Sequence, residues 1–98
     1  MAEIVLLKKA AEDIKNSRDW YDGKEENLGK LFVEKVHECI LRIAENPKAY
    51  PQKFRFLRAG LVATFPHSVF YKVEMNNVIK VYACLHHKQN SDHILGKR

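Results

Sequence analysis

The chain has 98 residues, of which 46% are hydrophobic and 30% are charged. This length and balance predict one globular domain over residues 1–98, and they exclude a disordered chain or a two-domain protein. There is no run of about 18 apolar residues, and the apolar N-terminal stretch lacks a basic region and a cleavage site. We therefore expect no membrane-spanning helix, no signal peptide and a cytoplasmic location. Cys39 and Cys84 lie in apolar patterns, which is typical of buried free thiols.

The formal net charge of +5 is unevenly distributed along the chain. Residues 1–47 carry 8 Lys/Arg and 10 Asp/Glu, a balance of 8 − 10 = −2. Residues 48–98 carry 9 Lys/Arg and 2 Asp/Glu, a balance of 9 − 2 = +7. A basic half of this kind attracts either nucleic acid or an acidic protein, and charge alone does not distinguish the two.

The first half predicts a short strand and two helices. Residues 3–7 (EIVLL) read as a buried strand. Helical spacing follows in Ala10, Ile14, Ser17 and Tyr21 and stops at Asp22-Gly23. A second, clearer helical stripe is formed by Leu28, Phe32, Val36, Ile40 and Ile43, and it ends at Asn46-Pro47 because proline disfavours helix at the preceding residue. We expect a helical hairpin with one apolar face, capped by the aromatic pair Trp20-Tyr21.

The second half predicts strands. Residues 54–65 suggest one strand, with Gly60 marking a bulge or bend. Apolar residues then alternate with polar ones over 69–74 and again over 79–86, where Ile79, Val81, Ala83 and Leu85 form the apolar set. Asn76-Asn77 between them suits a tight turn, since asparagine tolerates positive φ. Residues 87–98 look like a tail that is polar apart from Ile94-Leu95. The predicted fold is α+β in the order β-α-α-β-β-β, with the helical hairpin packed on one face of a small antiparallel-rich sheet.

Few residues suggest chemistry. No CxxC, HExxH, GxGxxG or P-loop motif is present, so we expect no metal and no cofactor. His86, His87 and His93 resemble a metal cluster, but adjacent strand residues point to opposite faces. A basic set remains: Arg55, Arg58, His67, His86, His87 and Lys88. It suits either an RNA-cleaving site, which needs a base, an acid and a cation, or a face that binds an acidic partner.

Several segments together resemble the ParE/RelE toxins of type II toxin–antitoxin systems. AAEDIKNSRDWYD is similar to the family's first helix, and LGKLFVEKVHECILRIAENPKAYP is similar to the second helix and following loop of the ParE-like branch. The sheet pattern of the family matches Arg58-Ala59, Phe65-Pro66-His67, Val69, Tyr71, Val81 and His86, in that order. The resemblance covers roughly residues 3–98. It implies a plasmid-stabilisation type of toxin that is held inactive by a cognate antitoxin.

The two branches of the family imply two functions. ParE-like members inhibit DNA gyrase, whereas RelE-like members cut messenger RNA on the ribosome. An endoribonuclease would use Arg58, His86 and Lys88 as its catalytic candidates. Antitoxin or target binding would use Arg55, Arg58, His67, His87 and Lys88.

Two departures from the family pattern are present, and the first of them favours the gyrase inhibitor, which catalyses nothing. His86-His87-Lys88-Gln89 stands where the family often has His-x-Arg-Arg, and lysine cannot make the bidentate phosphate contact of arginine. His67 stands where tyrosine is usual. The enzymatic status therefore depends on the branch, and a degenerate, non-toxic member of the same fold is a third hypothesis.

Overall fold

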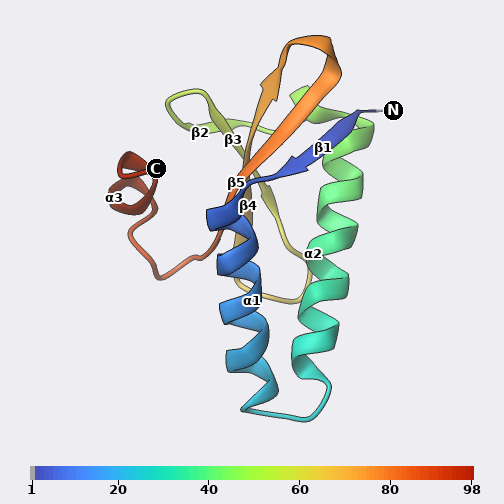
Figure 1. Ribbon diagram of the computed structural model, residues 1–98, viewed down its shortest axis with the longest axis vertical. Coiled ribbons are helices and arrows are strands. Elements are labelled where there is room, and N and C mark those ends of the chain that lie inside the picture. Colours follow the sequence, from blue (N-terminus) through green and yellow to red (C-terminus); the bar gives the residue numbers. More distant parts are fainter. Residues whose placement is uncertain (1) are drawn as a thin grey trace.

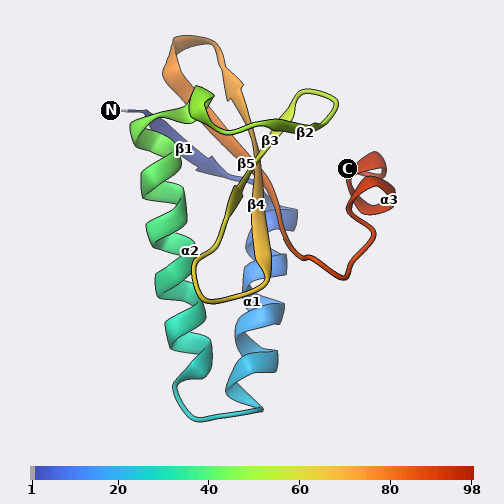
Figure 2. The same cartoon turned by 180° about the vertical axis from the view of Figure 1, so that it is seen from behind.

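A computed structural model describes residues 2–98 and places two long helices on one face of a five-stranded sheet (Figures 1 and 2). The elements are β1 (Glu3–Leu6), α1 (Lys8–Asp22), α2 (Leu28–Glu45), the short 3₁₀ helix η1 (Pro47–Ala49), β2 (Gln52–Phe54), β3 (Leu57–Leu61), β4 (His67–Glu74), the 3₁₀ turn η2 (Met75–Asn77), β5 (Val78–His86) and α3 (Ser91–Gly96). The strand order is β1-β5-β4-β3-β2. β1 pairs with β5 in parallel, and the other pairs are antiparallel. The predicted α+β fold is confirmed.

The helical hairpin closes through an unusually near approach of its two helices. Asp22, at the end of α1, accepts a hydrogen bond of 2.8 Å from the backbone N–H of Gly29, at the start of α2. A Cβ atom on Gly29 would lie 2.4 Å from the carbonyl oxygen of Arg18, well inside van der Waals contact. Only glycine fits there, so the Leu-Gly start of α2 is required by the packing of α1.

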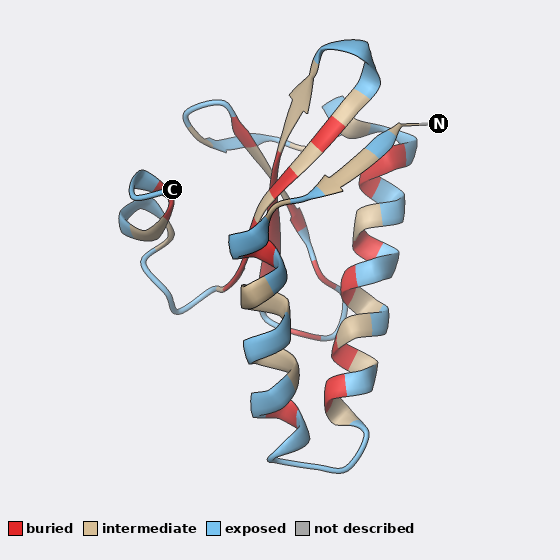
Figure 3. Cartoon of the chain, viewed as in Figure 1, coloured by how far each residue is buried: buried red, intermediate tan, exposed pale blue. Residues whose placement is uncertain are grey.

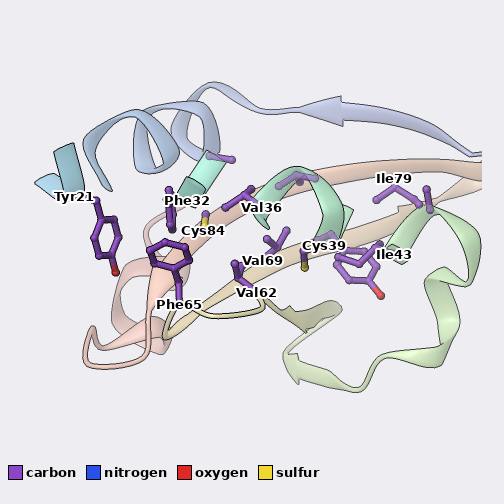
Figure 4. Packing of buried hydrophobic residues seen from close by; sticks show 14 residues of the cluster. Tyr21, Phe32, Val36, Cys39, Ile43, Val62, Phe65, Val69, Ile79 and Cys84 are labelled. Carbon is purple, nitrogen blue, oxygen red and sulfur yellow. The ribbon is translucent and has the colours of Figure 1, made fainter. Parts of the chain in front are cut away.

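The main core lies between α2 and the sheet, on the side that we call the helix face (Figures 3 and 4). The predicted stripe of α2 supplies Phe32, Val36 and Ile43, which are all buried, and Ile40 is half-buried against the same cluster. From the sheet, the cluster receives Val69, Tyr71, Ile79, Val81 and Cys84. The prediction that the stripe of α2 faces the sheet is confirmed.

A β-bulge in β5 changes which side chains reach each face. Phe70 pairs with Ala83 and Tyr71 with Val81, so Tyr82 is an extra residue on β5. The predicted alternation is therefore wrong at this point: Ile79 and Val81 lie on the helix face, but Ala83 and Leu85 lie on the opposite face. An inserted residue reverses the period-two pattern, and nothing in a regular alternation marks where that occurs.

The opposite side of the sheet, which we call the open face, carries a second and smaller core. Leu57, Phe70, Ala83 and Leu85 are buried there under Leu95 of α3. The tail was expected to be polar apart from Ile94-Leu95, and no helix was predicted in it. Residues 91–96 in fact form a helix, which places these two apolar residues against the sheet. Asn90 caps this helix by accepting a hydrogen bond of 3.1 Å from the N–H of His93.

The predicted strand over residues 54–65 is in fact a hairpin. β2 and β3 are joined by a tight turn in which Arg55 has φ of 52°. Gly60 is not a bulge, since it pairs regularly with Val69. Its backbone passes so close to α2 that an added Cβ would lie 3.0 Å from Cδ1 of Ile43. A glycine at position 60 is therefore explained by the close packing of α2 on the sheet and not by an irregularity of the strand.

The turn between β4 and β5 agrees with the sequence. Asn76 and Asn77 have φ of 62° and 61°, the left-handed conformation expected for this pair. No helix among residues 2–98 is long and apolar enough to cross a lipid bilayer.

In the second half of β5, side chains form the backbone hydrogen bonds that a neighbouring strand would otherwise form. β1 pairs with β5 only as far as Leu6 opposite Val81. Beyond that point, Asp13 of α1 accepts a hydrogen bond of 3.0 Å from the N–H of Cys84. The guanidinium of Arg98 binds both oxygens of Asp13 at 2.6 and 2.8 Å and donates to the carbonyl of Tyr82 at 3.1 Å. The backbone next to the bulge is therefore satisfied from α1 and from Arg98.

Phe32→Ala should lower the free energy of unfolding by about 3–5 kcal/mol, because it removes a fully buried aromatic ring and leaves a cavity. Urea unfolding monitored by circular dichroism measures this change. Leu41→Ala is the matched control, since Leu41 lies on the same helix but is 42% exposed, and it should cost less than about 1 kcal/mol. Equal unfolding midpoints for the two variants would contradict the packing described here.

Candidate functional site

His67 and His86 meet at one end of the sheet. His67 is the first residue of β4 and His86 the last of β5, and the two are directly paired across the ladder. Paired residues point to the same face, so both rings lie on the helix face, with centroids 5.1 Å apart. The last turn of α1 brings Tyr21 to the same place, with its hydroxyl 3.0 Å from Nε2 of His67.

His67 is held as a neutral ring. It is only 3% exposed and lies edge-on to Phe32, with ring centroids 4.8 Å apart. Burial, followed by the proximity of His86 and His87, lowers the pKa of His67 from 6.5 to about 4. Burial likewise raises the pKa of the Tyr21 hydroxyl, so it stays protonated. The Tyr21–His67 pair is therefore uncharged at neutral pH and contributes hydrogen bonding and shape rather than charge.

A hollow of about 360 Å³ opens beside this pair. It is lined by Ser17, Trp20, Tyr21, His67, His86 and Lys88. None of these side chains is acidic, and Lys88 is the basic residue among them. Trp20 is 59% exposed and is therefore available to a partner. A surface with one cation, neutral hydrogen-bonding groups and an exposed indole can bind an acidic or aromatic group.

The end of β5 is fixed by its own side chains. Nδ1 of His86 accepts a hydrogen bond of 3.0 Å from the N–H of Lys88, and Oε1 of Gln89 accepts one of 2.8 Å from the N–H of His86. Gln89 thus closes the turn at the strand end. This hydrogen bond gives Gln89 a structural role at a position where the family often has an arginine.

His87 points to the open face, away from His86. Its Nε2 lies 3.0 Å from the hydroxyl of Ser68, beside a separate hollow of about 140 Å³. Among residues 2–98, no group of three or more His, Cys, Asp or Glu side chains lies close enough together to hold a metal ion.

Arg58 lies at a distance from the histidines. It pairs with Tyr71, four residues along β4 from His67 or roughly 13 Å at the usual strand rise. Its guanidinium donates to the carbonyl oxygens of Lys48 and Tyr50, which anchors the loop after α2. Arg55 is exposed in the β2–β3 turn. The structure thus brings together His67, His86 and Lys88, and separates them from Arg55, Arg58 and His87.

Sequence reasoning missed the part played by Tyr21. We expected it to cap the helical hairpin together with Trp20, but it is 9% exposed and packs against Phe32 and Phe65. Its place on the apolar stripe of α1 was the available signal, since the neighbouring Trp20 does not share that stripe. The contact with His67 spans 46 residues of sequence and could not be read from local spacing.

A groove of about 520 Å³ lies on the open face. Its apolar lining includes Tyr50, Pro51, Ala59, Leu61 and Phe70, and Arg42 and Lys53 lie at its rim. Leu61, the last residue of β3, is 67% exposed. The groove is thus a largely apolar surface with basic residues in its lining.

Comparison with known proteins identifies the family. The protein-family model described as the ParE toxin of the type II toxin–antitoxin system parDE matches residues 4–91 of the sequence. The chain belongs to the ParE toxin family. The predicted resemblance to the ParE-like branch is therefore confirmed. None of the curated proteins matches the sequence significantly.

A solved structure supports the fold of this ParE-family chain. The structure titled "Chromosomal ParDE TA system from P. aeruginosa" is similar with a TM-score of 0.77, covering 88% of this chain and 96% of that chain at 17% sequence identity. At that identity, the likeness speaks for the fold alone. The ParE-like arrangement of helical hairpin and sheet is therefore retained although most residues differ.

The neutral His67 of this ParE-family chain should make stability depend on pH. The unfolded chain binds a proton at His67 below pH 6.5, whereas the folded chain does so only near pH 4. Stability should therefore fall as pH drops from 6.5 to 4, by up to about 3 kcal/mol from this residue. Urea unfolding of the parent and of His67→Gln between pH 4 and 7 measures the difference. Parallel curves for the two proteins would contradict the assignment.

Proposed function

We propose that this ParE-family toxin is neutralised by a cognate antitoxin and that it inhibits DNA gyrase by binding it, without a catalytic step of its own. The observation that carries the non-catalytic part is the separation of the basic groups. Cleavage of RNA needs a base, an acid and a cation around one phosphate. Here Arg58 lies roughly 13 Å from His67 along the strand and is bonded to loop carbonyls.

The histidines support the same proposal. His67 is buried, neutral and hydrogen-bonded to Tyr21, so it is not available for proton transfer to an outside substrate. Nδ1 of His86 already accepts a hydrogen bond from the N–H of Lys88, and Oε1 of Gln89 accepts one from the N–H of His86. The surface around Trp20, His86 and Lys88 is better suited to hold a protein partner, in which an aromatic residue and a cation serve as anchors.

The antitoxin would occupy the groove on the open face. An apolar segment of the antitoxin would cover the side chains of Leu61 and Phe70 in this groove. Acidic residues of the antitoxin would lie near Arg42 and Lys53. Antitoxin segments that fold on binding suit such a groove, because they can cover a long surface of a small protein. The basic half of the chain complements an acidic partner, and apolar burial would make the complex only partly sensitive to salt.

Leu61→Glu should weaken antitoxin binding by about a hundredfold, because it places a charge in the middle of an apolar contact. Leu6→Glu is the control: Leu6 is also exposed, at 44%, but lies on β1 at the other edge of the sheet. Isothermal titration with the antitoxin encoded beside the toxin gene measures both variants. If Leu61→Glu binds as tightly as the parent, the antitoxin lies elsewhere.

Purified toxin, freed from its antitoxin, should inhibit DNA supercoiling by gyrase and leave messenger RNA intact in a purified translation system. His86→Ala and Lys88→Ala should each change the inhibitory concentration by less than about tenfold, because a binding energy spread over a surface depends little on most single residues. Supercoiling assays on plasmid DNA measure this, with antitoxin added back as the control.

A ribosome-dependent endoribonuclease is the second candidate, and one observation favours it. His86, Lys88 and the exposed Trp20 share a single hollow, in which an RNA base could stack on the indole. Transcript cleavage that His86→Ala abolishes would establish this function in place of gyrase inhibition.

A further inference from the structure

β4 has an edge that no strand covers. β3 pairs with β4 from Leu61 opposite Ser68 to Arg58 opposite Tyr71. β4 continues for three more residues, and on its other side it stays paired with β5 as far as Glu74 opposite Val78. Among residues 2–98, no other backbone segment pairs with the free edge of residues 72–74. In Figure 1, the β4–β5 hairpin extends past the end of β3 at the top of the molecule.

A hollow of about 400 Å³ lies along this edge. Lys48 of η1 and the β2–β3 hairpin form one side, and Lys72, Val73 and Met75 form the other. The turns that shape it are tight, with positive φ at Arg55 on one side and at Asn76 on the other. The walls of the hollow are therefore set by two tight turns of the fold.

The rim of this hollow exposes large apolar side chains. Phe56 is 73% exposed and Met75 is 85% exposed, the highest values among the large hydrophobic residues that the structure describes. They stand on the tips of the two hairpins that flank the hollow, and the half-buried Val73 lies between them. Exposed methionine and aromatic residues beside a strand edge are typical of surfaces that receive a peptide.

The charge around the edge is positive. Lys48 and Lys72 line the hollow, and Arg55 lies in the adjoining turn. Glu74 is the one acidic residue between positions 48 and 91, and it is neutralised by Lys72 at 3.7 Å and Lys80 at 3.6 Å. An acidic segment would therefore be attracted to this surface, and a basic one would be repelled.

We propose that an extended, acidic segment of a partner protein binds here by adding a strand to the free edge of β4. Its backbone would pair with the outward N–H and C=O groups of residues 72–74. Its apolar side chains would cover Phe56 and Met75, and its carboxylates would face Lys48. A nucleic acid would match the charge, but it has no peptide groups with which to pair the strand edge.

This surface is separate from the ones already described. Glu74 lies seven residues from His67 along β4, roughly 23 Å at the usual strand rise. The groove around Leu61 and Phe70 is on the open face, next to α3. A toxin with its groove filled by antitoxin would thus keep the β4 edge free for a second partner, and the inference stands independently of gyrase as the target.

The test is a titration of the isotope-labelled full chain with a short capped peptide of alternating glutamate and valine, followed by amide NMR. Shifts should concentrate at residues 72–75, with slower hydrogen exchange at alternate amides. Lys48→Glu should weaken binding by about tenfold, whereas the control Lys15→Glu, on the exposed side of α1, should not. A peptide of the same sequence with alternate N-methyl groups should not bind, because it cannot pair as a strand.

Three outcomes would overturn the proposal. The first is binding of the N-methylated peptide as tightly as its parent, which would exclude strand pairing. The second is a set of shifts that maps to the groove around Leu61. The third is a shift of residues 72–75 by single-stranded oligothymidylate while the peptide leaves them unchanged. The last result would assign the surface to nucleic acid instead.

Discussion

The bulge at Tyr82 is the constraint on which the arrangement of the sheet depends. Before it, Ile79 and Val81 of β5 point to the helix face, and after it Ala83 and Leu85 point to the open face. Without the extra residue, each side chain of β5 after position 82 would point to the opposite face of the sheet. The core under α2 would lose Cys84, and the surface under α3 would lose Ala83 and Leu85. The inserted residue thus allows one strand to serve two cores.

The bulge also positions the candidate site. Because the register shifts by one residue, His86 falls on the helix face beside His67 and Tyr21, and His87 falls on the open face beside Ser68. Bulges leave backbone groups without a ladder partner, and Asp13 satisfies one of them from α1. The site and the packing of α1 are therefore coupled through the same irregularity in β5.

Much of the fold could be predicted from the sequence, and most of the misses share a cause. The stripe of α2 and the Asn76-Asn77 turn are local patterns, and the structure contains both. The β2–β3 turn is local, but Arg55 is not a residue type that marks a turn with positive φ. The bulge and the packing of α3 depend on contacts between distant segments, which the periodicity of the sequence does not reveal. The same holds for the site. A basic set was visible, but its division into the His67–His86 end and the Arg58 end depends on which strands are neighbours.

The parallel pairing of β1 with β5 has a consequence for protein synthesis. Glu3 pairs with Val78, a separation of 78 − 3 = 75 residues, so β1 cannot pair until β5 has been made. At about 5–20 residues per second, that wait lasts several seconds on the ribosome. Throughout this interval the nascent chain holds β1, α1 and α2 without β5, the strand with which β1 pairs. The helical hairpin is therefore complete long before the parallel edge of the sheet can form.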